Sequence, residues 1–343
     1  MLNLPIKNKK NILLNKYDKT ETTFTQCINQ DLKKVNNYII KNIKSEIPLI
    51  PVLSNHLLKS GGKRIRPALT ILFSKLFGYD CGLRNIELAS CIELIHMASL
   101  LHDDVVDESL LRRGSNTANS IWGNKASVLV GDYLFTKAFQ IMVKDKDTRV
   151  LKALSTASKS LAQGEVMQLS LENNIDVSKE KYFKVIEDKT AKLFSAASLV
   201  GGIVSDARES FFPLLSDYGE LIGTAFQIFD DAMDYDITNK DIGKKVGDDF
   251  KEGKVTLPVI LAVEKSNNKE RSFWIKAIEN LNQEKEDFDY ALSIINKYNA
   301  LHETKEVAQV YAKKAQKILE KLPNNIYNDA LVSLTHFIIK RNN

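Results

Sequence analysis

The segment LHDDVVDESLLRRG, residues 101–114, decides how the rest of the chain is interpreted. It follows residues 86–101, which are apolar on almost every helical face and so predict a buried helix. On that helix Asp103 and Asp107 are four residues apart and share a face, where two like charges repel each other. A divalent cation would turn this repulsion into attraction. A solvated acidic helix end is the simpler interpretation of DDxxD alone, but the buried helix before it favours a bound partner.

The same spacing returns in residues 227–235, QIFDDAMDY, at the end of a second apolar segment. Basic residues follow it, among them Lys244 and Lys254. One DDxxD is weak evidence, but two such motifs indicate acidic clusters that face each other across a cleft. Hard carboxylate oxygens favour magnesium, which completes its shell with phosphate and water. The sequence therefore predicts a magnesium and polyphosphate site.

Further cations stand where a second anion would bind. In KSGGKRIRP, residues 59–67, Lys63, Arg64 and Arg66 crowd the start of a predicted helix, where the backbone N–H groups favour an anion. His96 lies seven residues before Asp103 and roughly on its side, and Lys189 interrupts another apolar helix. Taken alone, the histidine is more simply a satisfied core residue and the lysine a snorkelling one. Both are also placed to contact phosphate.

Composition indicates a globular chain without a nucleic-acid function. The 343 residues are 44% apolar and 27% charged, and the net charge of +5 is mild. The three cysteines, Cys27, Cys81 and Cys91, show no metal-ligand spacing, which predicts a reducing, cytoplasmic compartment and no structural zinc. No apolar run reaches the roughly 18 residues of a membrane span. The first 17 residues are rich in Lys and Asn and contain no acid, so an organelle-targeting segment stays open, although a flexible tail over 1–21 is preferred.

From about residue 22 the apolar pattern is helical, with no sustained strand-like alternation. No linker divides residues 22–343, so we expect one all-α domain, a helical bundle around a central cavity. The candidate helices span residues 22–43, 47–59, 65–77, 84–107, 119–143, 147–172, 178–204, 208–235, 255–265, 271–281, 285–297, 301–321 and 325–340.

Five motifs in this order resemble those of the trans-type isoprenyl (polyprenyl) diphosphate synthases, most closely the long-chain octaprenyl-type enzymes. They are GGKRIRP, LHDDVVDESLLRRG, the KTA of residues 189–191, GTAFQIFDDAMD, and GKKVGDD with GKVTLP. The resemblance runs from about Thr22 to the C-terminus. Departures are small: Ala232 and Met233 replace the larger aliphatic residues usual in the second motif, Phe229 lies just before it, and no acidic residue is missing.

The resemblance implies a head-to-tail condensation of isopentenyl diphosphate onto an allylic diphosphate. It implies about three magnesium ions, with manganese able to substitute. Asp104 and Asp231 are expected to support the metal site or to bind through water, and Thr190 and Gln227 to lie near the developing carbocation. The expected metal ligands are Asp103, Asp107, Asp230 and Asp234. The expected allylic diphosphate ligands are Arg112, Lys189, Lys244 and Lys254, with Thr190 and Gln227 beside them. The expected isopentenyl diphosphate ligands are Lys63, Arg66, His96 and Arg113.

Small residues before the first motif predict a long product. Ala98 and Ser99 lie about one turn before Asp103, Ile95 a turn further, and the bulky aromatic plug of short-chain members is missing. The 18 residues from Asn85 to Asp103 form a wall of about 27 Å, which suits about eight isoprene units for a quinone side chain. The alternative is that these residues are small only for helix packing. Three residues are candidates for the floor of the tunnel: Phe135, Leu151 and Leu154.

Three other functions remain as rivals. A short- or medium-chain synthase would share the fold. A terpene cyclase or head-to-head synthase commonly lacks the paired GGKRxRP and RRG sites, which this chain retains. A non-catalytic partner subunit would be expected to lose carboxylates or arginines. A homodimer is expected only by resemblance, and the lipid product makes transient membrane contact reasonable.

Overall fold

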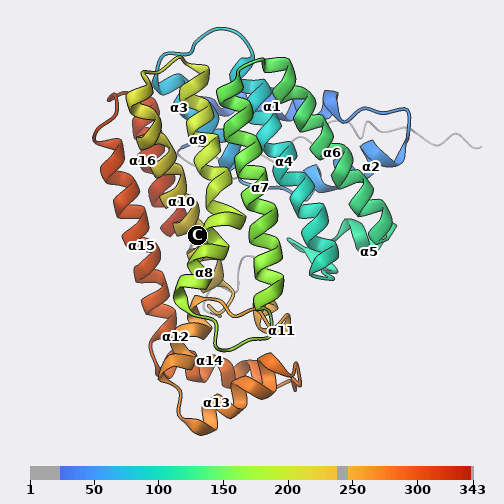
Figure 1. Ribbon diagram of the computed structural model, residues 1–343, viewed down its shortest axis with the longest axis vertical. Helices are drawn as coiled ribbons and strands as arrows, with labels where there is room; N and C mark the ends of the chain where they lie inside the picture. Colours follow the sequence, from blue (N-terminus) through green and yellow to red (C-terminus); the bar gives the residue numbers. More distant parts are fainter. Residues whose placement is uncertain (1–23, 238–245, 341–343) are drawn as a thin grey trace, which may run out of the picture.

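The computed structural model describes residues 24–237 and 246–340, and this part of the chain is almost entirely helical (Figure 1). The predicted all-α class is therefore confirmed. The first half contains α1 (Asn29–Asn42), α2 (Leu49–Lys59), α3 (Ile65–Leu76), α4 (Arg84–Val106), β1 (Leu111–Arg112), β2 (Ser115–Asn116), α5 (Ala118–Trp122), α6 (Asn124–Asp145) and α7 (Thr148–Leu171). The second half contains α8 (Lys179–Ile186), η2 (Glu187–Ala191), α9 (Lys192–Val204), α10 (Phe212–Met233), α11 (Asp248–Lys251), α12 (Leu257–Lys265), α13 (Asn268–Trp274), η5 (Ile275–Glu279), α14 (Asp287–Lys297), α15 (Ala300–Leu319) and α16 (Ile326–Ile339). Short 3₁₀ turns are η1 (Gln26–Ile28) and η3 (Glu209–Phe211).

Most predicted helices agree with these bounds, and the exceptions have local causes. The helix predicted from residue 119 is divided by Gly123, whose φ of 83° suits glycine and ends α5 before α6 begins. The helix predicted over 178–204 contains the π-helical turn η2, and the hairpin β1–β2 was not predicted at all. The tail over 1–21 and Lys244 lie outside the described residues.

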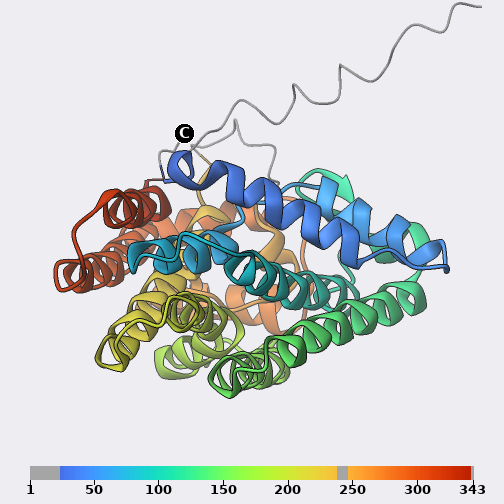
Figure 2. The ribbon, with the colours of Figure 1, turned by 90° about the horizontal axis from the view of Figure 1, so that it is seen from above.

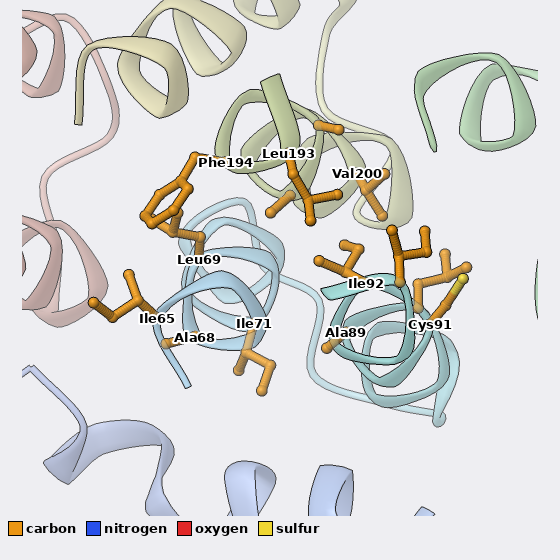
Figure 3. Packing of buried hydrophobic residues seen from close by; sticks show 14 of the residues in the cluster. Ile65, Ala68, Leu69, Ile71, Ala89, Cys91, Ile92, Leu193, Phe194 and Val200 are labelled. Carbon is orange, nitrogen blue, oxygen red and sulfur yellow. The ribbon is translucent and has the colours of Figure 1, made fainter. Parts of the chain in front are cut away.

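The core is built from helices that are buried on most faces. As predicted, α4 is one of them, with buried residues along nearly its whole length. Figure 3 shows α3, α4 and α9 side by side, with Leu69, Ile92 and Val200 among the buried residues that they contribute. The backbones of α3 and α9 approach closely, because a Cβ at Gly201 would lie 2.7 Å from the carbonyl oxygen of Thr70. Seen from above, α1 and α6 flank this core (Figure 2).

Residues of α12, α13 and α14 contribute to a second apolar cluster, in which Trp274 is fully buried. These helices lie at the lower end of Figure 1. The long helix α15 contributes to both clusters, since Ala308 belongs to the second and Ala312 to the first.

Helices α4 and α10 position the site. Each carries a DDxxD motif at its C-terminal end, and the two motifs meet in one region, because residues 248–254 contact Asp234 of the second motif and Asp107 of the first.

No membrane-spanning segment was predicted from the sequence, but helix α6 meets the length and composition test for one. Residues 124–145 are long and apolar enough to cross a membrane by length and composition, but core helices of soluble proteins pass the same test, so this is weak evidence.

Candidate active site

The second aspartate of the first motif is held by the protein itself. Asp104 is 1% exposed, and the hairpin β1–β2 returns Arg112 to it, with Nε and Nη2 at 2.8 and 2.7 Å from Oδ1. Burial raises the pKa of Asp104, and the arginine charge partly offsets this. Nδ2 of Asn119 also donates to the Asp104 backbone carbonyl at 2.9 Å. The Asp104 carboxylate therefore anchors the hairpin, while its predicted support of a metal site stays a prediction.

The first and last aspartates of this motif have lysine neighbours. Burial raises the pKa of Asp103 to about 8; the charge of Lys189 opposes this shift, and the carboxyl group of Glu165 adds to it. Lys254 Nζ lies 2.9 Å from Oδ2 of Asp107 and 2.8 Å from Glu252. Burial lowers the pKa of Lys254, but these carboxylates outweigh it and raise the pKa overall. Cationic side chains thus stand where the first motif would contact a metal and a diphosphate.

A hydrogen-bonded chain fixes the second motif. The buried Asp231 accepts from the hydroxyl of Tyr182 at 2.6 Å and from Nε2 of Gln227 at 2.8 Å. The amide oxygen of Gln227 in turn accepts from the hydroxyl of Thr190 at 2.9 Å. Asp231, like Asp104, is therefore held by protein donors. The expected cation-stabilising pair of Thr190 and Gln227 is connected directly to it.

The segment from Gly247 to Lys254 joins the two acidic motifs. The carboxylate of Asp234 is buried and accepts from the backbone N–H groups of Asp249 at 2.9 Å and of Asp248 at 3.4 Å. Lys254, at the other end of the segment, reaches Asp107 of the first motif. These contacts tie Asp234 to the backbone at α11, so it is the least accessible of the four expected metal ligands.

A separate group of cations surrounds the loop before α3. The guanidinium of Arg66 lies 4.5 Å from the centre of the Phe194 ring, and burial lowers its pKa to about 10. Its buried Nε has no hydrogen-bond partner among the described residues. Arg113 donates to the Gly61 carbonyl, and the carboxylate of Asp230 acts on both arginines. A guanidinium with a buried, unpartnered N–H, such as that of Arg66, is suited to a phosphate group.

Histidine and a buried ion pair complete this basic group. Burial, together with the charges of Arg66 and Arg113, lowers the pKa of His96 well below its usual value, so its imidazole is neutral and donates one N–H. Arg64 pairs with the buried Glu93 on α4, one turn before His96. Arg64 was predicted among the basic residues, but Glu93 was not predicted. Lys63 differs from the others, because its ammonium lies 4.8 Å above the Phe337 ring of α16.

The carboxylates fit magnesium better than a metal that needs a complete set of protein ligands. Among the described residues, no group of three or more His, Cys, Asp or Glu side chains is close enough to hold a metal alone. Magnesium binds through one or two carboxylates and takes its other ligands from phosphate and water. Asp103 and Asp107 at the C-terminal end of α4, and Asp230 at the C-terminal end of α10, can each give magnesium one carboxylate ligand.

Comparison with known proteins agrees with this geometry. The polyprenyl synthetase family model matches residues 48–295. The chain belongs to this family. It is 41% identical to an octaprenyl diphosphate synthase of Haemophilus influenzae, over 91% of this chain and 94% of the relative. A decaprenyl diphosphate synthase structure from Rhodobacter capsulatus has a TM-score of 0.89 and 43% identity, covering 93% of this chain and 98% of that one. A polyprenyl synthase from Caulobacter crescentus, solved with calcium and isoprenyl diphosphate, has a TM-score of 0.90 and 40% identity, covering 94% and 98%.

The structure thus brings the two acidic motifs of this polyprenyl synthetase together with two groups of basic residues. Lys189 and Lys254 lie beside the first motif, while Arg66 and Arg113, with the neutral His96, form the second group. Arg112 contacts Asp104, between them.

The residues expected to set product length lie on α4 above the first motif. Ile95 and Ala98 are buried, and Ser99 is half-buried with its hydroxyl donating to the His96 carbonyl at 2.9 Å. A cavity of about 460 Å³ lies elsewhere, between α8, α10 and α15, and none of the predicted site residues lines it.

Sequence reasoning missed two side chains that contact this site. Glu165 of α7 pairs with Lys189, and Tyr182 of α8 donates to Asp231. The signal for the first was Gly164, a glycine inside a helix, which often marks a close approach of two backbones. Tyr182 carried no signal, because its role depends on how α8 packs beside α10.

Proposed function

We propose that this protein condenses isopentenyl diphosphate head-to-tail onto a farnesyl-type allylic diphosphate, and repeats the step to make a long all-trans polyprenyl diphosphate. One observation carries the proposal: two separate groups of cations flank two acidic motifs. One group is suited to a diphosphate bridged by metal ions, and the other to a diphosphate held by the protein alone. Two diphosphate sites are what a condensation of two diphosphate substrates requires.

In this proposal the acidic side holds the substrate that ionises. Magnesium, when bound to Asp103, Asp107 and Asp230, would supply positive charge to the leaving diphosphate. Lys189 and Lys254 add fixed cations there, and Asp234 supports the segment that carries Lys254.

The remaining residues would orient the second substrate and protect the carbocation. Arg66, Arg113 and the neutral His96 bind the diphosphate of isopentenyl diphosphate, and Lys63 reaches it by turning from Phe337. The Thr190 hydroxyl and the Gln227 amide present fixed dipoles to the cation in a site from which apolar neighbours exclude water. Because the motif side chains offer no evident base, the released pyrophosphate takes the proton.

We propose a product of about eight isoprene units, because the small residues Ala98 and Ser99 leave room along the roughly 27 Å wall of α4. Relatives named as octaprenyl and decaprenyl synthases support a long product. The product would serve as a quinone side chain, with transient membrane contact for its release from a cytoplasmic enzyme.

The test uses the purified protein alone with isopentenyl diphosphate, farnesyl diphosphate and magnesium, followed by chromatography of the products. We expect a long polyprenyl diphosphate, its loss on chelation, and a drop of at least about 100-fold in Asp103→Asn. The exposed Asp289 of α14 provides the control variant Asp289→Asn, which should keep full activity. Absence of turnover by the wild type would favour a non-catalytic partner subunit, and products of farnesyl or geranylgeranyl length would favour the shorter-chain alternative.

We further propose that residues 22–343 act as one catalytic domain within a homodimer. The outer face of α6 supports the dimer, because Leu129 and Val143 are 67% and 66% exposed, and Val128 and Phe139 are exposed beside them. A second copy would cover this apolar face. Light scattering should give twice the 38.7 kDa of one chain, and Leu129→Glu with Val143→Glu should return the mass to a monomer. An unchanged dimer in that variant would exclude this face.

A further inference from the structure

We propose that Glu165 is a positioning residue that holds the ammonium of Lys189 in place for the allylic diphosphate and keeps it from pairing with Asp103. The inference rests on the proposed function, because it assigns a new residue to the same site. No sequence motif includes Glu165, and its position follows from the packing of α7 against η2.

The backbone of α7 touches the backbone of η2 at one point. A Cβ at Gly164 would lie 2.5 Å from the backbone nitrogen of Lys189 and 2.9 Å from its Cα, so only glycine permits this approach. Glu165 follows immediately, and its Oε2 lies 2.8 Å from Nζ of Lys189. The close contact at Gly164 therefore fixes the distance between the two backbones, and this distance lets Glu165 contact Lys189.

Glu165 holds the Lys189 ammonium, and Asp103 competes with it for that ammonium once Asp103 is ionised, as it must be to bind a metal. The charges of Lys189 and Glu165 both act on Asp103, so the three side chains lie close together. If Lys189 paired with Asp103, a cation would occupy a carboxylate that a metal needs. By accepting one of the three N–H bonds of Lys189, Glu165 leaves two for phosphate oxygens and leaves Asp103 to the metal.

The Glu165–Lys189 ion pair is largely shielded from water. The side chains of Lys189 and Glu165 are 22% and 21% exposed, so both are mostly shielded from water. The second oxygen of Glu165, Oε1, is buried and accepts no hydrogen bond within the described part of the chain. A buried oxygen atom without a hydrogen-bond partner is unfavourable for folding, and such atoms are expected at functional sites.

The chain provides a matched control on the same segment. Lys192, three residues after Lys189, pairs with Glu220 of α10, also at 2.8 Å, and keeps a second partner, Glu187, at 2.7 Å. Glu220 lines the 460 Å³ cavity between α8, α10 and α15, away from the acidic motifs. Glu220→Gln therefore removes the same kind of ion pair from the same segment without touching the proposed site.

The experiment compares Glu165→Gln, Glu165→Asp and Glu220→Gln in steady-state assays that vary farnesyl diphosphate, isopentenyl diphosphate and magnesium separately. Glu165→Gln should raise the KM for farnesyl diphosphate and the magnesium concentration for half activity by about tenfold, with the KM for isopentenyl diphosphate unchanged. Glu165→Asp, with the charge kept on a shorter side chain, should be intermediate. Glu220→Gln should keep both KM values and the magnesium concentration for half activity within about twofold of the wild type.

Binding of a non-reactive analogue, farnesyl thiodiphosphate with magnesium, measures the same effect without turnover. Weaker analogue binding in Glu165→Gln, with a thermal unfolding midpoint equal to that of Glu220→Gln, supports the positioning role. Equal behaviour of the two variants, or an equal rise in both KM values, overturns it. A wild type without prenyltransferase activity would instead contradict the proposed function, while the analogue binding would still test Glu165.

Discussion

At the scale of single residues, the two DDxxD motifs follow one division of labour. In each, the second aspartate is buried and held by protein donors, Asp104 by Arg112 and Asp231 by Tyr182 and Gln227. The first aspartates, Asp103 and Asp230, are less buried. A carboxylate that accepts strong hydrogen bonds in a fixed direction orients the helix end on which its neighbours lie. We therefore expect the second aspartates to orient the proposed metal ligands rather than to bind metal themselves.

Removing one of these donors should disturb the site. Tyr182→Phe deletes the hydroxyl that donates to Asp231, a bond to a charged group that contributes about 1.5–3 kcal/mol. We expect activity to fall about tenfold and the thermal unfolding midpoint to fall with it. Tyr298, whose hydroxyl donates to Glu270 at 2.7 Å beside α13, is a matched control. Tyr298→Phe should lower stability but leave activity per folded enzyme intact, and equal activity loss in both variants would contradict the role of Tyr182.

The raised pKa of Asp103 predicts a pH dependence of magnesium binding. In the metal-free protein the pKa is about 8, so the carboxyl group holds a proton below that pH, which magnesium must displace. Half-saturation should therefore need less magnesium as the pH rises from 6.5 to 8.5, by up to about tenfold per unit below the pKa. Magnesium titrations of activity at several pH values measure this.

The same shift gives the sign of a stability effect. Because the folded-state pKa lies above the unfolded value, Asp103 favours folding at low pH, and this contribution is lost as the pH rises through 8. Asp103→Asn should therefore raise the unfolding midpoint of the metal-free protein at pH 8.5 relative to wild type. No difference at that pH would mean that the group titrates normally.

At the scale of elements, the π-helical turn η2 is clamped between two helices. Gly164 of α7 meets the backbone of Lys189, and a Cβ at Gly223 of α10 would lie 2.8 Å from Cα of Ala191. A π turn inside a helix is strained and frequently lies at a functional site. The two glycines let the flanking backbones close on it, which directs Lys189 and Thr190 inward.

Adding one methyl group should therefore open this clamp. In Gly164→Ala the new Cβ must separate α7 from η2, and overpacking of this kind costs about 1–3 kcal/mol. We expect a lower unfolding midpoint and a higher KM for the allylic substrate, measured by thermal scans and steady-state kinetics. Thr156→Ala, an exposed position on the same helix, should change neither. Wild-type kinetics in Gly164→Ala would show that the spacing of α7 and η2 is not critical.

How much the sequence could reveal differs between these features. The acidic motifs, the basic loop and most helices were predictable because each is encoded within a few turns of chain. The pairing of Glu165 with Lys189 joins positions 24 residues apart, and that of Tyr182 with Asp231 joins positions 49 apart, so both depend on how helices pack. The π turn of η2 was missed because nothing in residues 187–191 distinguishes it from an ordinary helical segment.

At the scale of the whole molecule, we expect product length to depend on the space beside α4. This helix runs the length of the core from Arg84 to Val106, about 34 Å, and it carries Ala98 and Ser99 just above the first motif. Consecutive residues on a helix point about 100° apart, so the growing chain passes closer to one of the two than to the other. A large side chain at the residue that lines the tunnel should stop elongation early, whereas at a packing position it should only destabilise the core.

Ala98→Tyr and Ser99→Tyr together decide between tunnel and packing. We expect one of them to shorten the product to about farnesyl or geranylgeranyl length while initial condensation continues, because the diphosphate sites are untouched. Chromatography of the products gives the length, and thermal unfolding gives the packing effect, expected at about 1–3 kcal/mol where the ring does not fit. Ile95→Ala, one turn further from the motif, should lengthen the product or leave it unchanged. If both tyrosine variants fold and still make the wild-type product, the hydrocarbon does not run along this face of α4, and the outer helices α6 and α7 must bound its path instead.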